Sequence, residues 1–119
     1  MRKILFRGKT DKGEWVYGDL SQHKTGKRFI KCGSATQSYE VRPETVGQYT
    51  GLTDDNDNKI FEGDIVKCFS SDYVGNPKID TITVKDMIDY NTMVYLNCSD
   101  RLVIIGNIHD NPEMLRGED

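Results

Sequence analysis

The residues best suited to bind a metal ion lie in one short acidic segment. Asp54, Asn56 and Asn58 alternate as the first oxygen ligands of an EF-hand calcium loop do. The later positions depart from that loop, because Lys59 stands where glycine is required and Ile65 where a bidentate glutamate should be. Asp and Asn side chains also hydrogen-bond their own backbone in tight turns. We therefore predict a hairpin turn here and no metal cofactor.

Other acids and the two histidines could in principle support hydrolysis. Glu62 and Asp64, with the acids of residues 54–57, could gather magnesium ions for nuclease chemistry. Acids in neighbouring turns are usually only solvated, so a metal-dependent hydrolase is the least favoured function. His23 and His109 have no Cys, Asp or Glu at metal-binding or triad spacing in their own segments.

The three cysteines do not form a recognisable motif. Cys32, Cys68 and Cys98 lie about thirty residues apart, and none belongs to a C-x-x-C pair. We predict buried thiols rather than a disulfide framework or a zinc site. With no catalytic residues identified, the sequence favours a protein that is not an enzyme.

The basic N-terminal third is the strongest candidate for a binding surface. Residues 1–31 hold nine Lys and Arg against three Asp and Glu, whereas residues 32–119 hold seven against sixteen. Opposed charges attract, so we predict a surface that binds another protein or a second copy of the chain, in a homo-oligomer. The candidate residues are Arg2, Lys3, Arg7, Lys24, Lys27, Arg28 and Lys31.

Nucleic acid is the alternative partner for the same basic residues. Phe6, Trp15, Tyr17 and Phe29 lie among them in sequence, and aromatic rings stack on bases while lysine and arginine neutralise phosphates. Strand alternation is expected to send several of these aromatics into the core, and the acidic remainder would repel a polyanion. Nucleic-acid binding therefore ranks second.

Composition favours strands over helices. Ile, Val and Thr outnumber Leu, and Ala35 is the only alanine. We predict one all-β, mainly antiparallel domain over residues 1–119. It has an N-terminal β-meander in residues 1–52, an SH3-like barrel in residues 60–108, and a short helical turn beginning after Asn111 at Pro112. The expected strands lie at residues 3–7, 14–20, 28–32, 37–42, 46–52, 60–68, 79–86, 93–98 and 102–108.

Turn residues separate these strands. Thr10–Gly13 and residues 53–59 are each expected to form a hairpin turn, and Pro43 to end the strand before it. Gly63 can take a positive φ, and Asp64 can brace the turn as the next strand begins. SH3-like barrels often begin with such a Gly-Asp step. Residues 86–92 could instead form one helical turn.

The chain has no apolar run near the roughly 20 residues that a membrane span needs. The apolar stretch Ile4–Phe6 is too short for a signal peptide. We therefore predict a cytoplasmic protein with no membrane partner.

Five blocks of sequence carry a family resemblance, and they follow one another over nearly the whole chain. The segments Gly47–Leu52 and Glu62–Val66 are the most specific part of the pattern. With these blocks the chain resembles the YopX family of phage and prophage proteins. The resemblance implies an accessory protein in the bacterial host cell, with no known activity and no catalytic residues to carry over. It also implies that a protein partner would be a host or phage protein. The blocks are residues 2–8, 15–20, 46–54, 60–66 and 105–113.

Overall fold

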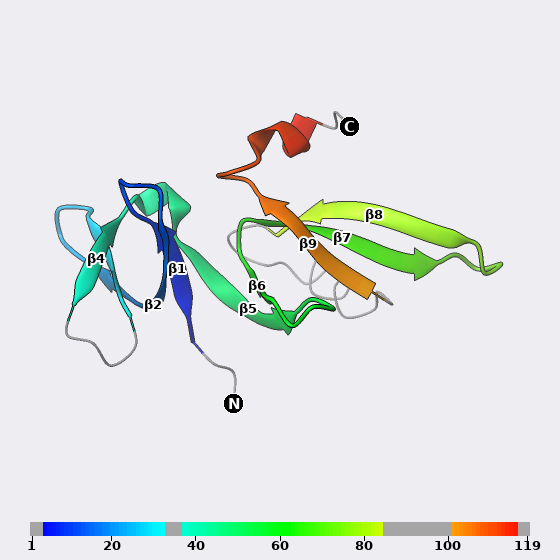
Figure 1. Ribbon diagram of the computed structural model, residues 1–119, viewed down its shortest axis with the longest axis horizontal. Helices are drawn as coiled ribbons and strands as arrows, with labels where there is room; N and C mark the ends of the chain where they lie inside the picture. The colour runs from blue at the N-terminus through cyan, green and yellow to red at the C-terminus, as the bar shows by residue number, and fades with distance from the viewer. Residues whose placement is uncertain (1–3, 33–36, 85–100, 117–119) are drawn as a thin grey trace. The chain divides into compact units, whose positions relative to one another are not determined.

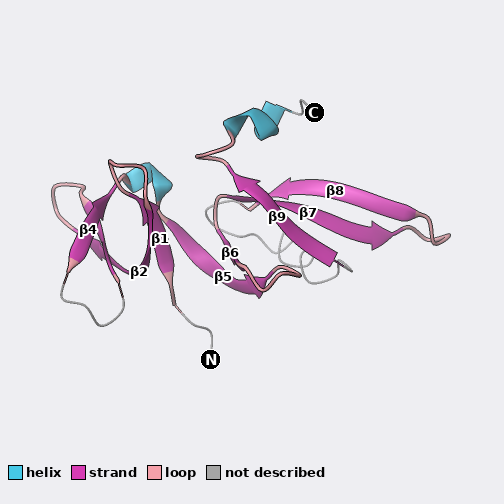
Figure 2. Ribbon diagram, viewed as in Figure 1, coloured by secondary structure: helices cyan, strands magenta, loops and turns pink. Residues whose placement is uncertain are grey.

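A computed structural model of the chain describes residues 4–32, 37–84 and 101–116. The chain divides into two compact units, Met1–Gly51 (unit 1) and Leu52–Asp119 (unit 2). The described residues form strands and two short 3-10 helices, with no α-helix among them. Figure 2 colours these elements by secondary structure. The predicted all-β, antiparallel fold is therefore confirmed.

Unit 1 is an antiparallel meander that continues into a fifth strand (Figure 1). Its strands lie side by side in the order β4-β3-β2-β1-β5, so the predicted N-terminal β-meander is confirmed. Pro43 begins a 3-10 helix directly after β4, which agrees with its predicted role as a strand breaker. The elements are β1 (Phe6–Lys9), β2 (Trp15–Gln22), β3 (Arg28–Lys31), β4 (Ser38–Val41), η1 (Pro43–Thr45) and β5 (Gly47–Thr53).

The sheet of unit 1 curls so that the end of β4 returns to β1. The backbone N–H of Arg42 donates to the carbonyl oxygen of Lys9 at 2.8 Å, and the N–H of Lys9 donates to Oγ1 of Thr45 at 2.8 Å. Gly8 permits this approach, because a Cβ there would lie 2.7 Å from Cγ2 of Val41. The enclosed face carries the buried side chains of Ile30 and Val41.

Unit 2 is built on a three-stranded antiparallel sheet with the long strand β7 at its centre, in the order β8-β7-β9. The first strand of the unit, β6, is the hairpin neighbour of β5, which runs across the boundary between the units. The elements are β6 (Lys59–Phe61), β7 (Asp64–Ser71), β8 (Pro77–Thr83), β9 (Arg101–Asn107) and η2 (Pro112–Arg116).

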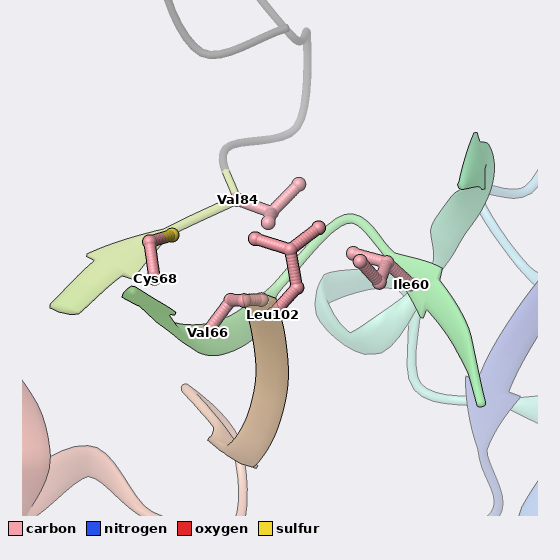
Figure 3. Packing of buried hydrophobic residues seen from close by; sticks show 5 residues of the cluster. All are labelled: Ile60, Val66, Cys68, Val84 and Leu102. Carbon is pink, nitrogen blue, oxygen red and sulfur yellow. The ribbon is translucent and has the colours of Figure 1, made fainter. Parts of the chain in front are cut away.

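The core of unit 2 gathers residues from β6, β7 and β9, together with Val84, which directly follows β8. Figure 3 shows the cluster, in which Val66 and Cys68 alternate along β7 and point to the same side. Most of its members are fully buried, and each buried aliphatic side chain of this size contributes roughly 1.5–3 kcal/mol of hydrophobic stabilisation. The cluster consists of Ile60, Val66, Cys68, Val84 and Leu102.

The turns follow the predicted local chemistry. Gly63 has a φ of +94°, and the carboxylate of Asp64 accepts a hydrogen bond from the backbone N–H of Phe61 at 2.8 Å. The helical turn predicted at Pro112 is present as the 3-10 helix η2.

The finer prediction of an SH3-like barrel over residues 60–108 is not supported. No closed barrel is found among the described residues, and the described part of that range forms the three-stranded sheet and β6. A Gly-Asp step fixes one turn, but barrel closure depends on long-range strand pairing that this step does not determine. The strand predicted at 93–98 and the helical turn at 86–92 lie outside the described residues.

Candidate binding surface

Strand register in unit 1 collects aromatic and basic side chains on one side of the sheet. Lys9 pairs with Trp15, and Arg7 with Tyr17, across β1 and β2. Because side chains alternate between faces, the partners in a register pair and every second residue share a face. Across β2 and β3 the same rule adds Asp19 with Lys31 and Ser21 with Phe29. We call this side the outer face: Arg7, Lys9, Trp15, Tyr17, Asp19, Ser21, Phe29 and Lys31.

The aromatic residues of the outer face point away from the core, contrary to the expectation that several of them would form it. Ile30 is fully buried on the opposite face of β3, whereas Phe29 beside it is half-buried and Tyr17 is 47% exposed. Phe6 lies on the enclosed face, where its register partner is the buried Gly18, and is itself half-buried. The outer face therefore presents rings as well as charges.

Two cations lie against the single tryptophan. The guanidinium carbon of Arg7 is 4.6 Å from the centroid of the Trp15 ring, and Nζ of Lys9 is 5.8 Å from it. Such contacts are attractive because the ring face carries partial negative charge. Arg7 is only 6% exposed, so its guanidinium packs against the Trp15 ring and presents little charge at the surface.

The structure separates the predicted basic residues into distinct environments. Lys31 is exposed on the outer face, and Lys24 and Lys27 are exposed in the turn between β2 and β3. Arg28 lies on the opposite face from Lys31, and its guanidinium donates to the carbonyl oxygen of Gly26 at 2.8 Å. Arg2 and Lys3 lie outside the described residues.

The outer face ends in a ring contact beside the lysine turn. His23 and Phe29 have ring centroids 4.6 Å apart at an interplanar angle of 49°. Sequence reasoning named Trp15, Tyr17 and Phe29 as aromatic neighbours of the basic residues, but did not place them together on an exposed face. The alternate spacing of residues 15 and 17, and of 29 and 31, is the only sequence signal of this arrangement.

The segment that imitates a calcium loop is a hairpin turn held by Asp54, as predicted. The buried carboxylate of Asp54 accepts hydrogen bonds from the backbone N–H groups of Asn56 and Asn58, both at 2.9 Å, and of Ile104 at 3.2 Å. Asp57 in the turn has a φ of +64°, the left-handed geometry that Asp and Asn tolerate.

Hydrogen bonding keeps Asp54 ionised. Burial alone would raise the pKa of this carboxyl, but the N–H groups of Asn58, Ile104 and Asn56 stabilise its charged form more strongly, so the pKa lies below its ordinary value. The neighbouring Asp55 accepts from Nε of Arg101 at 3.0 Å. The two acids therefore fasten the turn to β9.

Potential metal ligands do not converge in the part of the chain that the structure describes. Within those residues, no three His, Cys, Asp or Glu side chains lie close enough to hold a metal ion. Cys68 is buried in the core, as predicted, whereas Cys32 is half-buried and Cys98 lies outside the described residues.

The C-terminal sequence block forms a compact loop after β9. Oδ1 of Asn107 accepts hydrogen bonds from the backbone N–H groups of His109 at 3.0 Å and Asp110 at 2.9 Å. Gly106 leaves room for Asn111, because a Cβ at this position would lie 2.6 Å from Oδ1 of Asn111. Asn107 and Gly106 therefore have structural roles in forming this loop.

The strands and charged faces define a small all-β protein of two units. Comparison with protein families matches residues 5–116 to the model described as YopX protein, and the chain therefore belongs to the YopX family. It is similar in fold to the crystal structure of protein EF1440 from Enterococcus faecalis, with 24% sequence identity and a TM-score of 0.51. That similarity covers 97% of this chain and 99% of the other. None of the curated proteins compared with the chain matches it.

No helix within residues 4–32, 37–84 and 101–116 is long and apolar enough to cross a bilayer.

Proposed function

We propose that this chain is an accessory protein of a phage or prophage, acting in the bacterial cytoplasm as a non-enzymatic module that binds proteins, including a second copy of itself. Membership of the YopX family supports the phage context. The binding role is supported by one observation, the separation of charge between the two units.

The two structural units differ in the sign of their formal charge. Unit 1 carries ten Lys and Arg against five Asp and Glu, a formal charge of +5. Unit 2 carries six against fourteen, a formal charge of −8. Opposed surfaces on one molecule favour association between the basic unit of one copy and the acidic unit of another, or capture of another charged protein.

Charge reversal in either unit tests this association. Replacing Lys24, Lys27 and Lys31 by Glu changes unit 1 from +5 to −1. All three side chains are exposed, whereas Arg28 bonds the backbone of its turn and is left unchanged. Association measured by sedimentation at about 10 mM salt, where the Debye length is about 30 Å, should be lost, and the wild type should dissociate at about 150 mM salt.

The matched control reverses Lys59, Lys67 and Lys78 in unit 2. Both triple variants change the net charge from −3 to −9, so they match in net charge and differ in the unit that is changed. The unit 2 variant should still associate, because its acidic unit becomes more acidic. Equal loss of association in both variants would show that repulsion from the net charge of the chain controls association, and not attraction between the basic and acidic units. A wild type that is monomeric at about 10 mM salt would overturn self-association.

A further inference from the structure

We propose that the outer face of unit 1 binds single-stranded nucleic acid, with Trp15, Tyr17 and Phe29 stacking on bases and Lys9 and Lys31 contacting phosphates. This goes beyond the proposed protein-binding function and rests on separate observations. They are the register that places these rings together and the exposure of Tyr17 and Lys31 on that face, where Trp15 and Phe29 are half-buried.

The geometry favours a single strand over a duplex. Trp15 and Tyr17 lie two residues apart on β2, a separation of about 7 Å along a strand. Bases in a duplex are about 3.4 Å apart along each strand and are stacked on one another, so their faces are not accessible to a protein ring. An extended single strand can place successive bases on rings of this spacing.

The charges of the outer face complement a phosphate backbone. Lys9 and Lys31 lie on it, the exposed Lys24 and Lys27 lie in the turn at its end, and Asp19 is the acid paired with Lys31 in the register. Arg7 is a positioning residue, because its buried guanidinium supports the Trp15 ring at 4.6 Å. The acids of unit 2 oppose a polyanion only within the Debye length, about 10 Å at 0.1 M salt.

Fluorescence anisotropy with labelled oligo-dT and oligo-rU of about 20 nucleotides tests the proposal, with duplex dA·dT of the same length as a comparison. The wild-type protein should bind at least one of the single strands more tightly than the duplex at about 50 mM salt, and more weakly at about 200 mM. No binding at the lower salt, or equal binding of the duplex, would overturn the stacking face.

Two exposed tyrosines provide a matched pair of variants. Tyr17→Ala removes a ring from the outer face and should weaken single-strand binding roughly 5- to 150-fold, the range expected for one stacked base. Tyr73→Ala removes a fully exposed ring from unit 2 and should leave binding unchanged. Trp15 fluorescence and circular dichroism establish that both variants are folded. Equal effects of the two substitutions would contradict the assignment.

Charge variants test the same face without removing a ring. Lys31→Gln should weaken binding and reduce the slope of log affinity against log salt by about 0.7, the value for one phosphate contact on a single strand. Asp19→Asn should strengthen binding by removing the acid paired with Lys31. The control is Lys78→Gln in unit 2, which should change neither quantity.

The ring variant also separates this proposal from the protein-binding one. Tyr17→Ala leaves the charge of unit 1 unchanged, so charge-driven self-association should persist while single-strand binding weakens. If Tyr17→Ala abolishes self-association and the wild type binds no oligonucleotide, the outer face is a protein interface and the nucleic-acid proposal is wrong.

Discussion

The two units use their charged residues in opposite ways. In unit 2, Asp54, Asp64 and Asp72 each accept hydrogen bonds from backbone N–H groups of their own turns. In unit 1, the lysines of the turns and of β3 are exposed, and the aromatic rings beside them lie outside the core.

This difference shows that the formal charge of a unit does not equal the charge that its exposed side chains present to a binding partner. Several acids that give unit 2 its −8 also stabilise turns, so their removal would alter the fold as well as the surface. The exposed lysines of unit 1 can be changed with little effect on folding, because surface substitutions away from special features usually shift stability by no more than about 0.5 kcal/mol. Binding is therefore best tested with the exposed lysines of unit 1.

The largest expected effect comes from crowding the sheet of unit 1. In Gly18→Ala the new Cβ would overlap the carbonyl oxygen of Lys31 on β3, so β2 and β3 would have to separate. We expect a loss of about 3 kcal/mol in the stability of unit 1. Urea unfolding followed by the fluorescence of Trp15, the only tryptophan, measures it.

A control variant and amide hydrogen exchange, followed strand by strand, decide whether the two units unfold independently of each other. Gly26→Ala places a Cβ in open space at a φ of +92°, and should cost only about 1–2 kcal/mol of backbone strain. In Gly18→Ala, amide hydrogen exchange should accelerate in β2 and β3 but not in β7. Equal acceleration in β7 would mean that the two units unfold as one, and the comparison between them would fail.

A destabilising substitution in unit 2 should accelerate amide exchange in that unit and not in unit 1, with a somewhat smaller loss of stability than Gly18→Ala causes. Asp54→Ala leaves the N–H groups of Asn56, Asn58 and Ile104 without their acceptor, and we expect a loss of about 2–3 kcal/mol. Exchange should accelerate in β7 and β9, with β2 unchanged. Asp72→Ala removes a similar turn acid at an exposed hairpin tip, and its smaller effect serves as the control.

Local turn chemistry could be predicted from the sequence because it depends on a few neighbouring residues. The hydrogen bonds that Asp54 accepts from Asn56 and Asn58, the one that Asp64 accepts from Phe61, and the positive φ of Gly63 all lie within short segments of chain. The strand that begins near Leu102 and the helical turn at Pro112 follow from similarly local signals. A few residues fix these features, whatever the rest of the chain does.

The outer face could not be predicted because it depends on register between strands. A shift of one residue between β2 and β3 would pair Phe29 with a different partner and move its ring to the other side of the sheet. The burial of Arg7 likewise follows from its position between β2 and β5, which pair with it from distant parts of the chain. Barrel closure, which is not found among the described residues, could not be predicted for the same reason, since a single Gly-Asp step contains no information about long-range pairing.

The smallest expected effect concerns the charge of Asp54 rather than its side chain as a whole. Asp54→Asn keeps the size of the side chain and an acceptor oxygen but removes the negative charge. The pKa of Asp54 in the folded protein lies below the ordinary value of 3.8, so its ionised form stabilises unit 2 fully above that pH. As the pH falls below 3.8 and through the folded pKa, this contribution is lost.

The stability difference between wild type and Asp54→Asn should therefore be constant near neutral pH and shrink in acid. Urea unfolding of both proteins between pH 7 and about pH 2.5 measures this difference directly, with hydrogen exchange in β9 as the probe of unit 2. Other carboxylates titrate in both proteins and cancel in the comparison. A difference that does not change with pH would mean that the turn of unit 2 depends on the shape of Asp54 and not on its charge. Unit 2 would then use acids as turn formers without drawing stability from their ionisation, and its contrast with the exposed cations of unit 1 would be one of position alone.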